Sequence, residues 1–412
     1  MQKASFSRYD IFVIAILTIL QFTLILDFMV LSPLGAILMP ALKISTAQFG
    51  MVVSAYAFSA GISGFLAAGF ADKFDRKKLL LFFYIGFIGG TLFCGLATNY
   101  HYLLLARIVT GIFGGVIGSI SFAIITDLFR LEQRGRVMGF VQMAFASSQV
   151  LGLPIGLYFA NLWGWHAPFI MIVLVSIVIA VMIIIYLKPI DAHLKIKSDR
   201  NPFMHLWKTI SHSIYLKTFV ATTLLATGGF MMMPFGTAFG VNNLKLTLAQ
   251  LPLLYMVTGG FSMLTGPLVG KLSDSWGKYR VFFVGSVIMI AIVLIYTNLG
   301  PTPLWMVIIL NIIMFIGISS RMISTSALIS AVPDSTDRGA FMSINSSIQQ
   351  ISGGVAAYVA GLIVVQTATG ELEHYDTLGY VVSGSIVITI ILIWFLDQYV
   401  TQKTKAEIAK AP

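Results

Sequence analysis

Long apolar stretches separated by short polar segments run through the whole chain. They lie near residues 11–38, 47–70, 79–98, 102–127, 136–160, 165–187, 216–240, 250–270, 280–298, 302–330, 339–364 and 378–398. A helix needs about 20 apolar residues to cross roughly 30 Å of hydrocarbon, and each stretch approaches or exceeds that length. Barrel strands are shorter and alternate polar with apolar residues. The pattern therefore predicts an all-α membrane protein with twelve transmembrane helices.

One polar segment is much longer than the others, and it divides the chain into two halves. It runs from Lys188 to Ser213 and contains prolines, aspartates and basic residues. We expect an N-terminal six-helix bundle at residues 1–187, a cytoplasmic linker at 188–215, a second six-helix bundle at 216–400 and a cytoplasmic tail at 401–412.

The composition is that of a chain covered by lipid. Hydrophobic residues make up 58% of the 412 residues and charged residues 10%, whereas a soluble domain carries roughly a quarter charged residues. The first apolar stretch is longer than the hydrophobic region of a signal peptide, so we expect it to remain as the first span. The single cysteine, Cys94, excludes a disulfide framework. The sequence has no phosphate loop, metal-ligand cluster or nucleophile elbow, so we expect no cofactor, no metal and no enzyme activity.

The basic residues are distributed unevenly between the two sides of the predicted spans. With the N-terminus inside, the inner segments hold Lys3, Arg8, Lys73, Arg76, Lys77, Lys78, Arg130, Arg134, Arg136, Lys188, Lys195, Lys197, Arg200, Lys208, Lys217, Lys271, Lys278, Arg280, Arg338, Lys403, Lys405 and Lys410. The opposite side has Lys43 and Lys245. The positive-inside rule then puts both termini in the cytoplasm, and the short loops favour a bacterial cytoplasmic (inner) membrane. The net charge of +10 is thus a topological signal, with the anionic inner leaflet rather than nucleic acid as its partner.

Two short motifs occur once in each half at almost the same spacing. A loop places an acidic residue, Asp72 or Asp274, before a basic run, and an Arg-Gly pair follows at Arg134 or Arg338. The acidic residues are 202 positions apart and the arginines 204. Repeated halves joined by a central loop are typical of a large class of membrane transporters.

These loops resemble the signature of the major facilitator superfamily, roughly G-x-L-A-D-R-x-G-R-R. The second copy agrees with it at Gly270, Leu272, Asp274, Gly277 and Lys278, and the first copy at Asp72, Arg76 and Lys77. The resemblance covers essentially the whole chain. It implies two pseudo-symmetric six-helix bundles with a small-molecule substrate bound between them.

Three further motifs are similar to those of the drug/sugar-efflux branch, the drug–proton antiporters. They are Asp27 within Leu26-Asp27-Phe-Met-Val, Arg107 within the stretch from Leu103 to Gly111, and Gly152-Leu-Pro154-Ile-Gly156 followed by Gly164-Trp165. The resemblance implies a secondary active transporter that exports a small organic solute (drug, sugar or metabolite) in exchange for protons, by alternating access. We expect a monomer, because twelve spans with an internal repeat make a pathway without a partner chain.

Asp27 and Arg107 are charged residues inside predicted spans. Because a carboxylate in hydrocarbon is costly, we expect Asp27 to face a cavity, pair with a cation or bind a proton. At 1.5 Å per residue, Arg107 lies about 8 Å and Asp27 about 16 Å from the outer ends of their spans, and an arginine side chain bridges much of that difference. We predict that both take part in proton coupling. The alternatives are a purely structural ion pair and an Arg107 side chain that extends outward to the headgroups.

Five further polar residues within the spans are candidates for the substrate cavity: Gln21, Gln142, Arg321, Asn345 and Gln349. The neutral ones offer hydrogen-bond donors and acceptors, although such residues equally well join helices to one another. Arg321 has no counterpart in the family motifs. In a cavity it would favour a substrate with negative or strongly polar character, and the alternative is a side chain that extends inward to the headgroups.

The loop motifs supply candidate gating residues: Asp72, Arg76, Asp127, Asp274 and Lys278. By the resemblance, Arg76 binds Asp127 at the inner end of the fourth span, and Asp72 lies at the positive N-terminal end of the eleventh helix. Such contacts would latch the halves closed on the inner side. The simpler interpretation is that these charges only solubilise the loops and set the topology.

Two other functions fit the same fold. A uniporter or importer of a sugar or metabolite needs no titrating carboxylate, so a proton site at Asp27 would argue against it. A non-transporting membrane receptor is expected to carry a soluble signalling domain or a long tail, and the sequence shows neither.

Overall fold

The computed structural model describes residues 6–67, 73–191, 194, 209–334 and 337–410. The first half contains α1 (Arg8–Leu42), α2 (Thr46–Ala67), α3 (Arg76–Gly95), α4 (Tyr100–Leu128), α5 (Leu131–Ser147), η2 (Ser148–Gly152), α6 (Leu153–Trp163) and α7 (Ala167–Tyr186). The second half contains α9 (Ser213–Phe230), α10 (Gly236–Asn242), η4 (Leu248–Gln250), α11 (Leu251–Trp276), α12 (Lys278–Tyr296), α13 (Leu304–Ala331), α14 (Arg338–Ile363), β1 (Val365–Gln366), β2 (Leu372–Glu373) and α15 (Tyr375–Lys410). The two strands pair antiparallel, with Val365 opposite Glu373.

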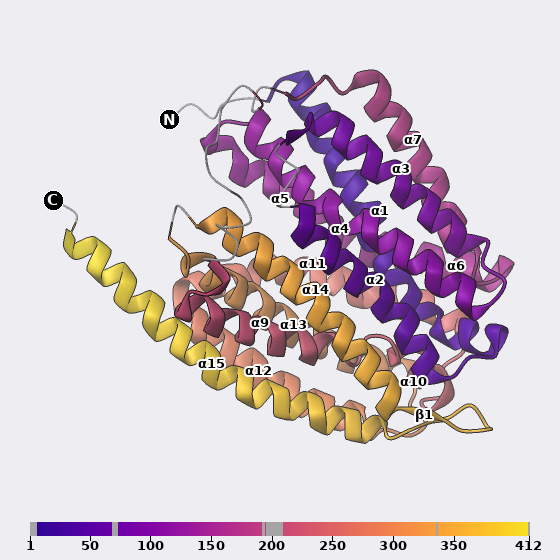
Figure 1. The fold of residues 1–412 in the computed structure, drawn as a ribbon. Coiled ribbons are helices and arrows are strands. Elements are labelled where there is room, and N and C mark those ends of the chain that lie inside the picture. Colours follow the sequence, from indigo (N-terminus) through magenta and orange to yellow (C-terminus); the bar gives the residue numbers. More distant parts are fainter. Residues whose placement is uncertain (1–5, 68–72, 192–193, 195–208, 335–336, 411–412) are drawn as a thin grey trace.

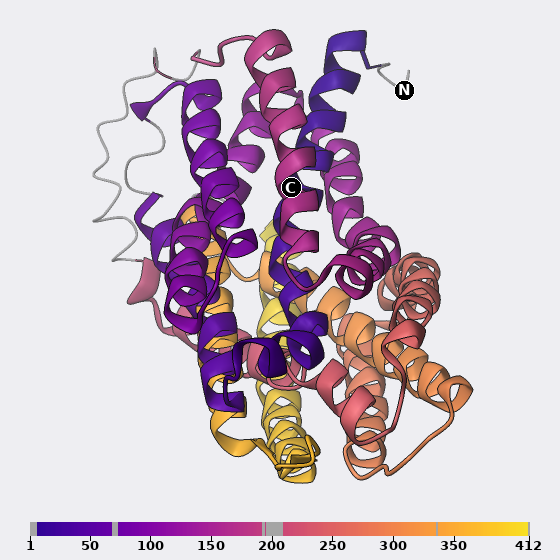
Figure 2. The ribbon, with the colours of Figure 1, turned by 90° about the vertical axis from the view of Figure 1, so that its right-hand side faces the viewer.

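The helices form two groups, and both termini lie at the same end of the molecule (Figure 1). Helices of the first half occupy the upper part and those of the second half the lower part of both ribbon views (Figures 1 and 2). We call the end with the termini the terminal end and the end with the β1–β2 hairpin the far end. Most of the predicted linker lies outside the described residues. The predicted tail from residue 401 continues α15 without a break as far as Lys410.

Twelve spans are predicted, and ten helices among the described residues are long and apolar enough to cross a membrane. The other two spans are α14 and the seventh, which is divided into α9 and α10. Both carry many hydroxyl or amide side chains, and α14 packs against both α2 and α9. Because neighbouring helices cover them, they need less apolar surface than a helix that faces lipid. The predicted all-α fold of two helical bundles is confirmed.

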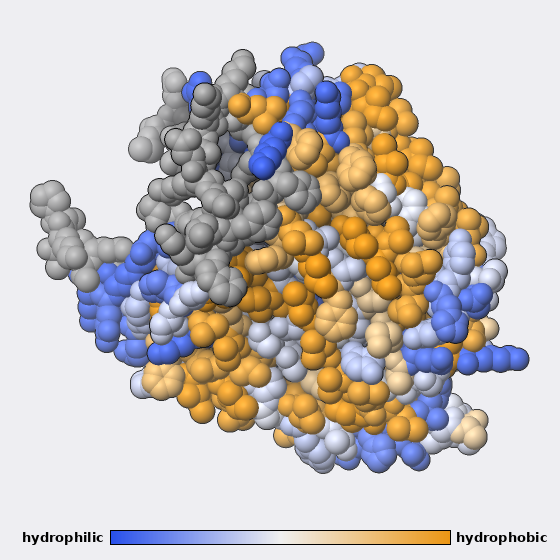
Figure 3. All heavy atoms as spheres, viewed as in Figure 1, coloured by the Kyte–Doolittle hydropathy of each residue, from blue (hydrophilic) through white to orange (hydrophobic). Residues whose placement is uncertain are grey.

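Large apolar side chains cover much of the surface. On α7, Leu174, Val178 and Ile185 are each exposed by about three fifths. Apolar side chains spread over the visible face of the molecule, and hydrophilic ones gather toward its edges (Figure 3). A soluble monomer rarely exposes so large an apolar surface, whereas hydrocarbon chains solvate it well.

Polar residues determine where several helices begin and end. Ser7 and Asp10 form a capping box at α1, in which each backbone N–H donates to the other side chain, at 2.8 and 3.1 Å. Asp75 and Asn99 accept hydrogen bonds from the first turns of α3 and α4, each at 3.0 Å. Gly277 has φ 105° between α11 and α12, a backbone conformation that explains the glycine in the second copy of the loop motif.

The fifth span is one continuous segment with a change of helical pitch. The chain runs from α5 through the π turn η2 into α6. Pro154 is the second residue after this turn, and a proline removes one backbone donor and displaces the carbonyl four residues before it. The irregular turn therefore coincides with the Gly-Leu-Pro motif of the sequence, and its Gln149 backbone packs against Gly259 of α11 in the other half.

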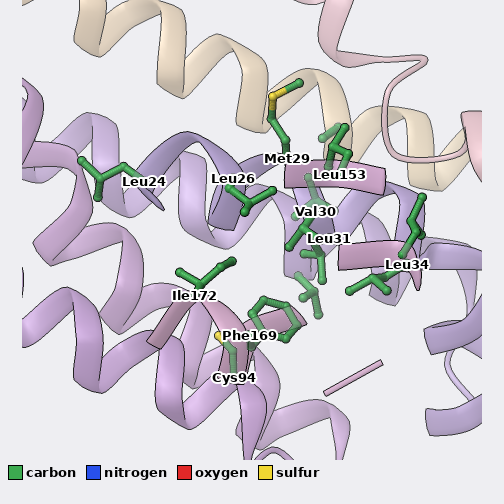
Figure 4. Close-up of a cluster of buried hydrophobic side chains, with 14 of the residues drawn as sticks. Leu24, Leu26, Met29, Val30, Leu31, Leu34, Cys94, Leu153, Phe169 and Ile172 are labelled. Atoms are coloured by element: carbon green, nitrogen blue, oxygen red, sulfur yellow. The ribbon is translucent and has the colours of Figure 1, made fainter. Parts of the chain in front are cut away.

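The first half packs around apolar side chains of α1. Leu26, Val30 and Leu34 share one buried cluster with Leu153 of α6 and Phe169 of α7 (Figure 4). Cys94 is buried in the same cluster. This apolar packing fixes the position of the turn of α1 that carries the neighbouring charged residue, Asp27.

Candidate transport site

Asp27 of α1 and Arg107 of α4 form an ion pair inside the first half. Nη1 of Arg107 lies 2.8 Å from Oδ2 of Asp27, and the Thr91 hydroxyl of α3 donates a hydrogen bond to the other carboxylate oxygen at 3.1 Å. The side chains of Asp27 and Arg107 are 0% and 1% exposed. The predicted contact is therefore present, and Arg107 does not extend to the headgroups.

The Arg107 guanidinium also lies over an aromatic ring. Its central carbon is 4.5 Å from the centre of the Tyr56 ring on α2, a cation–π contact. Phe28 of α1 packs against the same ring, with 5.4 Å between the ring centres. Nε and Nη2 of Arg107 have no hydrogen-bond partner among the described residues. The guanidinium thus binds Asp27 through one nitrogen and keeps donors on two others.

Small residues allow the helices around this ion pair to approach one another closely. A Cβ added at Gly115 of α4 would lie 2.5 Å from Cα of Ala60 on α2, and one at Gly90 of α3 would lie 2.8 Å from Cα of Thr110 on α4. Gly90 of this contact directly precedes Thr91, whose hydroxyl reaches the carboxylate. In the sequence Thr91 is one of several hydroxyl-bearing residues of an apolar span, and no motif distinguishes it from the others.

The neutral cavity candidates lie in different environments. Gln21 of α1 is half-buried, and its Oε1 has no hydrogen-bond partner among the described residues. Gln142 of α5 is exposed, and Gln349 of α14 is half-buried. Oδ1 of Asn345 accepts a hydrogen bond from the Thr222 hydroxyl of α9 at 2.6 Å. Asn345 therefore joins two helices of the second half, which was the alternative interpretation of these residues.

The charged cavity candidate, Arg321 of α13, lies inside the second half. It is 4% exposed, and its guanidinium carbon is 5.7 Å from the centre of the Phe282 ring on α12. Nε and Nη2 have no hydrogen-bond partner within the part of the chain that the structure describes. The side chain does not extend to the headgroups, so the alternative interpretation of Arg321 is wrong.

The gating candidates are separated in the structure. Nε of Arg76 lies 3.1 Å from Oδ2 of Asp127, which confirms the predicted contact. Both residues belong to the first half, so this ion pair joins α3 to α4 and cannot by itself latch one half to the other. Asp72 lies outside the described residues, and its predicted position stays a prediction. Asp274 and Lys278 line a hollow at the α11–α12 turn and form no ion pair within the described residues.

The described hydrogen bonds between the halves lie toward the far end, and α2 and α14 also pack against each other as far as Gly64 and Ser347. Within the described ranges, three hydrogen bonds join the halves: Thr46 Oγ1 to Val364 O at 2.5 Å, Ser54 Oγ to Gly354 O at 2.7 Å, and Asn161 Nδ2 to Leu248 O at 3.1 Å. Glycines let the backbones of α2 and α14 touch, since a Cβ at Gly361 would lie 2.8 Å from the Thr46 carbonyl oxygen. Direct packing therefore closes the far end.

Two helical halves that pack against each other in a membrane-spanning bundle are the architecture of a large class of transporters. A family model described as the Major Facilitator Superfamily matches residues 17–319 and 263–412. The chain belongs to this superfamily and is a multi-pass membrane transporter of that type.

Curated relatives support this assignment. The chain is similar to the uncharacterized MFS-type transporter YceJ of Bacillus subtilis (strain 168), at 29% identity over 266 residues, 64% of this chain and 67% of YceJ. It is 32% identical to Multidrug resistance protein 3 of the same organism over 152 residues, which cover 37% of this chain and 30% of that protein. Multidrug resistance protein 2 of that organism is 23% identical over 287 residues, 68% of this chain and 71% of the relative.

Solved structures of low sequence identity share the fold. The nucleoside transporter NupG has a TM-score of 0.75 at 15% identity, over 93% of this chain and 99% of NupG. A bacterial homolog of the human lysosomal transporter Spinster, in an inward-facing and unoccupied conformation, has a TM-score of 0.66 at 17% identity, over 96% of this chain and 97% of the homolog.

Proposed function

We propose that this transporter exports a small organic solute (drug, sugar or metabolite) in exchange for protons. The observation that carries the proposal is the buried Asp27–Arg107 pair. An ionisable residue in a transmembrane span is by default a functional candidate, and Asp27 is the one acidic residue in the sequence that lies deep within a span. The likeness to two multidrug resistance proteins supports export over import.

The contacts of Arg107 offer a route from proton binding to movement of the halves. A proton on Asp27 removes the negative charge that holds Arg107, whose two other donors are then available to new partners. Arg107 also lies on Tyr56 of α2, and α2 packs along α14 of the second half. A shift of the guanidinium therefore acts on a helix that closes the far end.

We further propose that the terminal end faces the cytoplasm and that the structure is an inward-facing state. The basic residues at the terminal end support this orientation, and the hydrogen-bonded closure of the far end supports this state. Arg76 and Asp127 then lie at the cytoplasmic end, where their ion pair joins the first turn of α3 to the last turn of α4 as a gating element.

The test is proton flux in liposomes that contain the purified protein, under an imposed pH gradient, with a panel of drugs, sugars and metabolites added in turn. We expect solute-dependent proton movement in the wild type and its loss in Asp27→Asn. The matched control is Glu373→Gln, which neutralises an exposed carboxylate of the far-end hairpin and should leave the flux unchanged. If solute movement depends neither on the pH gradient nor on Asp27→Asn, antiport is contradicted. The remaining interpretation is then a uniporter or importer.

A further inference from the structure

The protein has three buried arginines among its described residues, and they differ in their partners. Arg76 pairs with Asp127 and Arg107 with Asp27. Arg321 has neither an ion pair nor a hydrogen bond within the part of the chain that the structure describes. A buried charge without a partner is strongly unfavourable, so the environment of Arg321 needs a physical explanation.

Arg321 lies deep in the second half. It is ten residues from the C-terminal end of the 28-residue helix α13, which places its Cα about 15 Å from that end. The Phe282 ring of α12 covers the guanidinium on one side. A Cβ at Gly228 of α9 would lie 3.8 Å from Nη1 of Arg321 and 3.7 Å from Ile386 of α15. The cation is therefore enclosed by four helices.

The sequence offers no acidic residue at this depth of the second half. The acidic residues of the whole second half are Asp274, Asp334, Asp337, Glu371, Glu373, Asp376, Asp397 and Glu407. All except Asp397 lie in loops or near helix ends. Asp397 is eleven residues beyond Ile386 on α15, about 16 Å along the helix axis, and it lines the hollow at the α11–α12 turn. No carboxylate among the described residues of the second half therefore supplies the counter-charge of Arg321.

Three buried hydroxyl groups on helices of this region also lack partners among the described residues: Ser286 of α12, Thr325 of α13 and Ser383 of α15. Thr325 is four residues after Arg321 and so shares its helix face. By the same spacing Ser286 shares the face of Phe282, and Ser383 lies one turn before Ile386. Other hydroxyls of these spans donate to the carbonyl four residues back, as Thr389 does to Ser385 at 2.6 Å. The three hydroxyls thus keep their donors available.

We propose that Arg321, with the hydroxyls of Ser286, Thr325 and Ser383, forms an anion-binding site in the second half, and that it takes a carboxylate or a comparable single negative group. A guanidinium and O–H donors are the groups that bind the acceptor oxygens of such an anion. The same chemistry fits the anionic group of a transported solute or a free inorganic anion. The solute assignment rests on the proposed transport function and narrows the substrate class to organic anions.

The test is thermal unfolding of the purified full-length protein in detergent at constant ionic strength. The probes are benzoate and acetate, their neutral amides benzamide and acetamide, and chloride. We expect at least one of the anions, and neither amide, to raise the unfolding midpoint of the wild type in a saturable manner. In Arg321→Gln the apparent affinity should fall by about tenfold or more, the loss of at least one charge-assisted hydrogen bond. Arg321→Lys should retain part of it, and Thr325→Val should weaken it.

Arg280→Gln, which removes an exposed arginine of the α11–α12 turn, is the matched control and should bind like the wild type. Without added anion, Arg321→Gln should be at least as stable as the wild type, because it removes an unpaired charge; a structural role for Arg321 predicts a loss. If benzoate or acetate binds, the ligand class is an organic anion. If chloride alone binds, the assignment of the ligand as an anionic solute is overturned. Equal responses of wild type and Arg321→Gln to every anion overturn the site.

The anion site and proton coupling can fail independently. Asp27→Asn should lose proton flux and keep the Arg321-dependent stabilisation by anions, because Asp27 lies in the other half. If anions bind through Arg321 but no solute-dependent proton flux is seen, the anion site stands and proton antiport is contradicted. Proton flux in a protein that does not bind anions through Arg321 would leave antiport with a different substrate class.

Discussion

At the residue scale, the buried charges of this transporter fall into two kinds. Asp27 and Arg107 neutralise each other, and Thr91 and Tyr56 complete their surroundings. Each of these two charges is stable in the interior only because the other is present. Arg321 has a similar degree of burial and no such partner within the described residues. The first half therefore supplies its own counter-ion, and no described carboxylate of the second half does so for Arg321.

Removal of one member of the buried pair should destabilise the protein more than removal of both. Arg107→Met leaves the Asp27 carboxylate without its cation, which we expect to lower the free energy of unfolding by about 3–5 kcal/mol. Asp27→Asn combined with Arg107→Met removes both charges and should recover part of that loss. Thermal unfolding in detergent, followed by tryptophan fluorescence, measures the difference. Equal midpoints for the single and the double variant would show that the unpaired Asp27 carboxylate carries no cost of its own.

At the element scale, close approach of the helices depends on small residues and on local irregularities. Gly115 and Gly90 allow backbone contact between α2, α4 and α3 around the ion pair. The π turn before Pro154 packs its backbone against Gly259 of α11, and the seventh span is interrupted between α9 and α10. Such features let neighbouring helices shift against one another without separating.

A methyl group at the α2–α4 contact should destabilise the first half. Gly115→Ala places a Cβ against the Ala60 backbone, which cannot move aside, and we expect a loss of about 1–3 kcal/mol. Gly89→Ala is the matched control, because a Cβ at Gly89 of α3 meets nothing within 4 Å. It should leave stability unchanged or raise it by up to about 1 kcal/mol. Unfolding midpoints check both, and a neutral Gly115→Ala would contradict the close contact.

At the scale of the whole molecule, the two halves meet along α2 and α14. Hydrogen bonds from Thr46 and Ser54 to backbone carbonyls of the second half tie these helices together. Alternating access requires this contact to open once in every cycle, so we expect solute movement to depend on its separation.

A disulfide across this contact should stop transport. The Cβ of Ala57 lies 3.3 Å from the Cβ position at Gly354, close to the separation in a disulfide. Ala57→Cys with Gly354→Cys should lose solute movement in liposomes on oxidation and regain it on reduction. The native cysteine, Cys94, is buried, so we expect it not to form a disulfide with the introduced cysteines.

The matched control for this cross-link is Met289→Cys with Gly317→Cys. It joins α12 to α13 within the second half, at a Cβ separation of 3.4 Å. Oxidation of the control pair should leave transport intact, because no contact between the halves is involved. Full activity of the oxidised pair across α2 and α14 would show that this contact does not open during transport.

The sequence by itself predicted the spans, the two halves and an Asp27–Arg107 contact, the last beside an alternative in which Arg107 extends to the headgroups. These follow from local quantities: the length of an apolar stretch, the 1.5 Å rise of a helix and the cost of a charge in hydrocarbon. The contact between Arg76 and Asp127 came from the family motif, because no length or period along the chain relates a loop arginine to a distant helix end.

Only the tertiary structure decided which way each side chain faces. It showed that Asn345 bonds to Thr222, that Gln142 is exposed and that Arg321 has no partner among the described residues. In a soluble helix, an apolar stripe marks the buried face. Here lipid and neighbouring helices are both apolar, so apolar residues surround each span and leave its rotation undetermined. That rotation, and with it the composition of each site, is set by packing between helices.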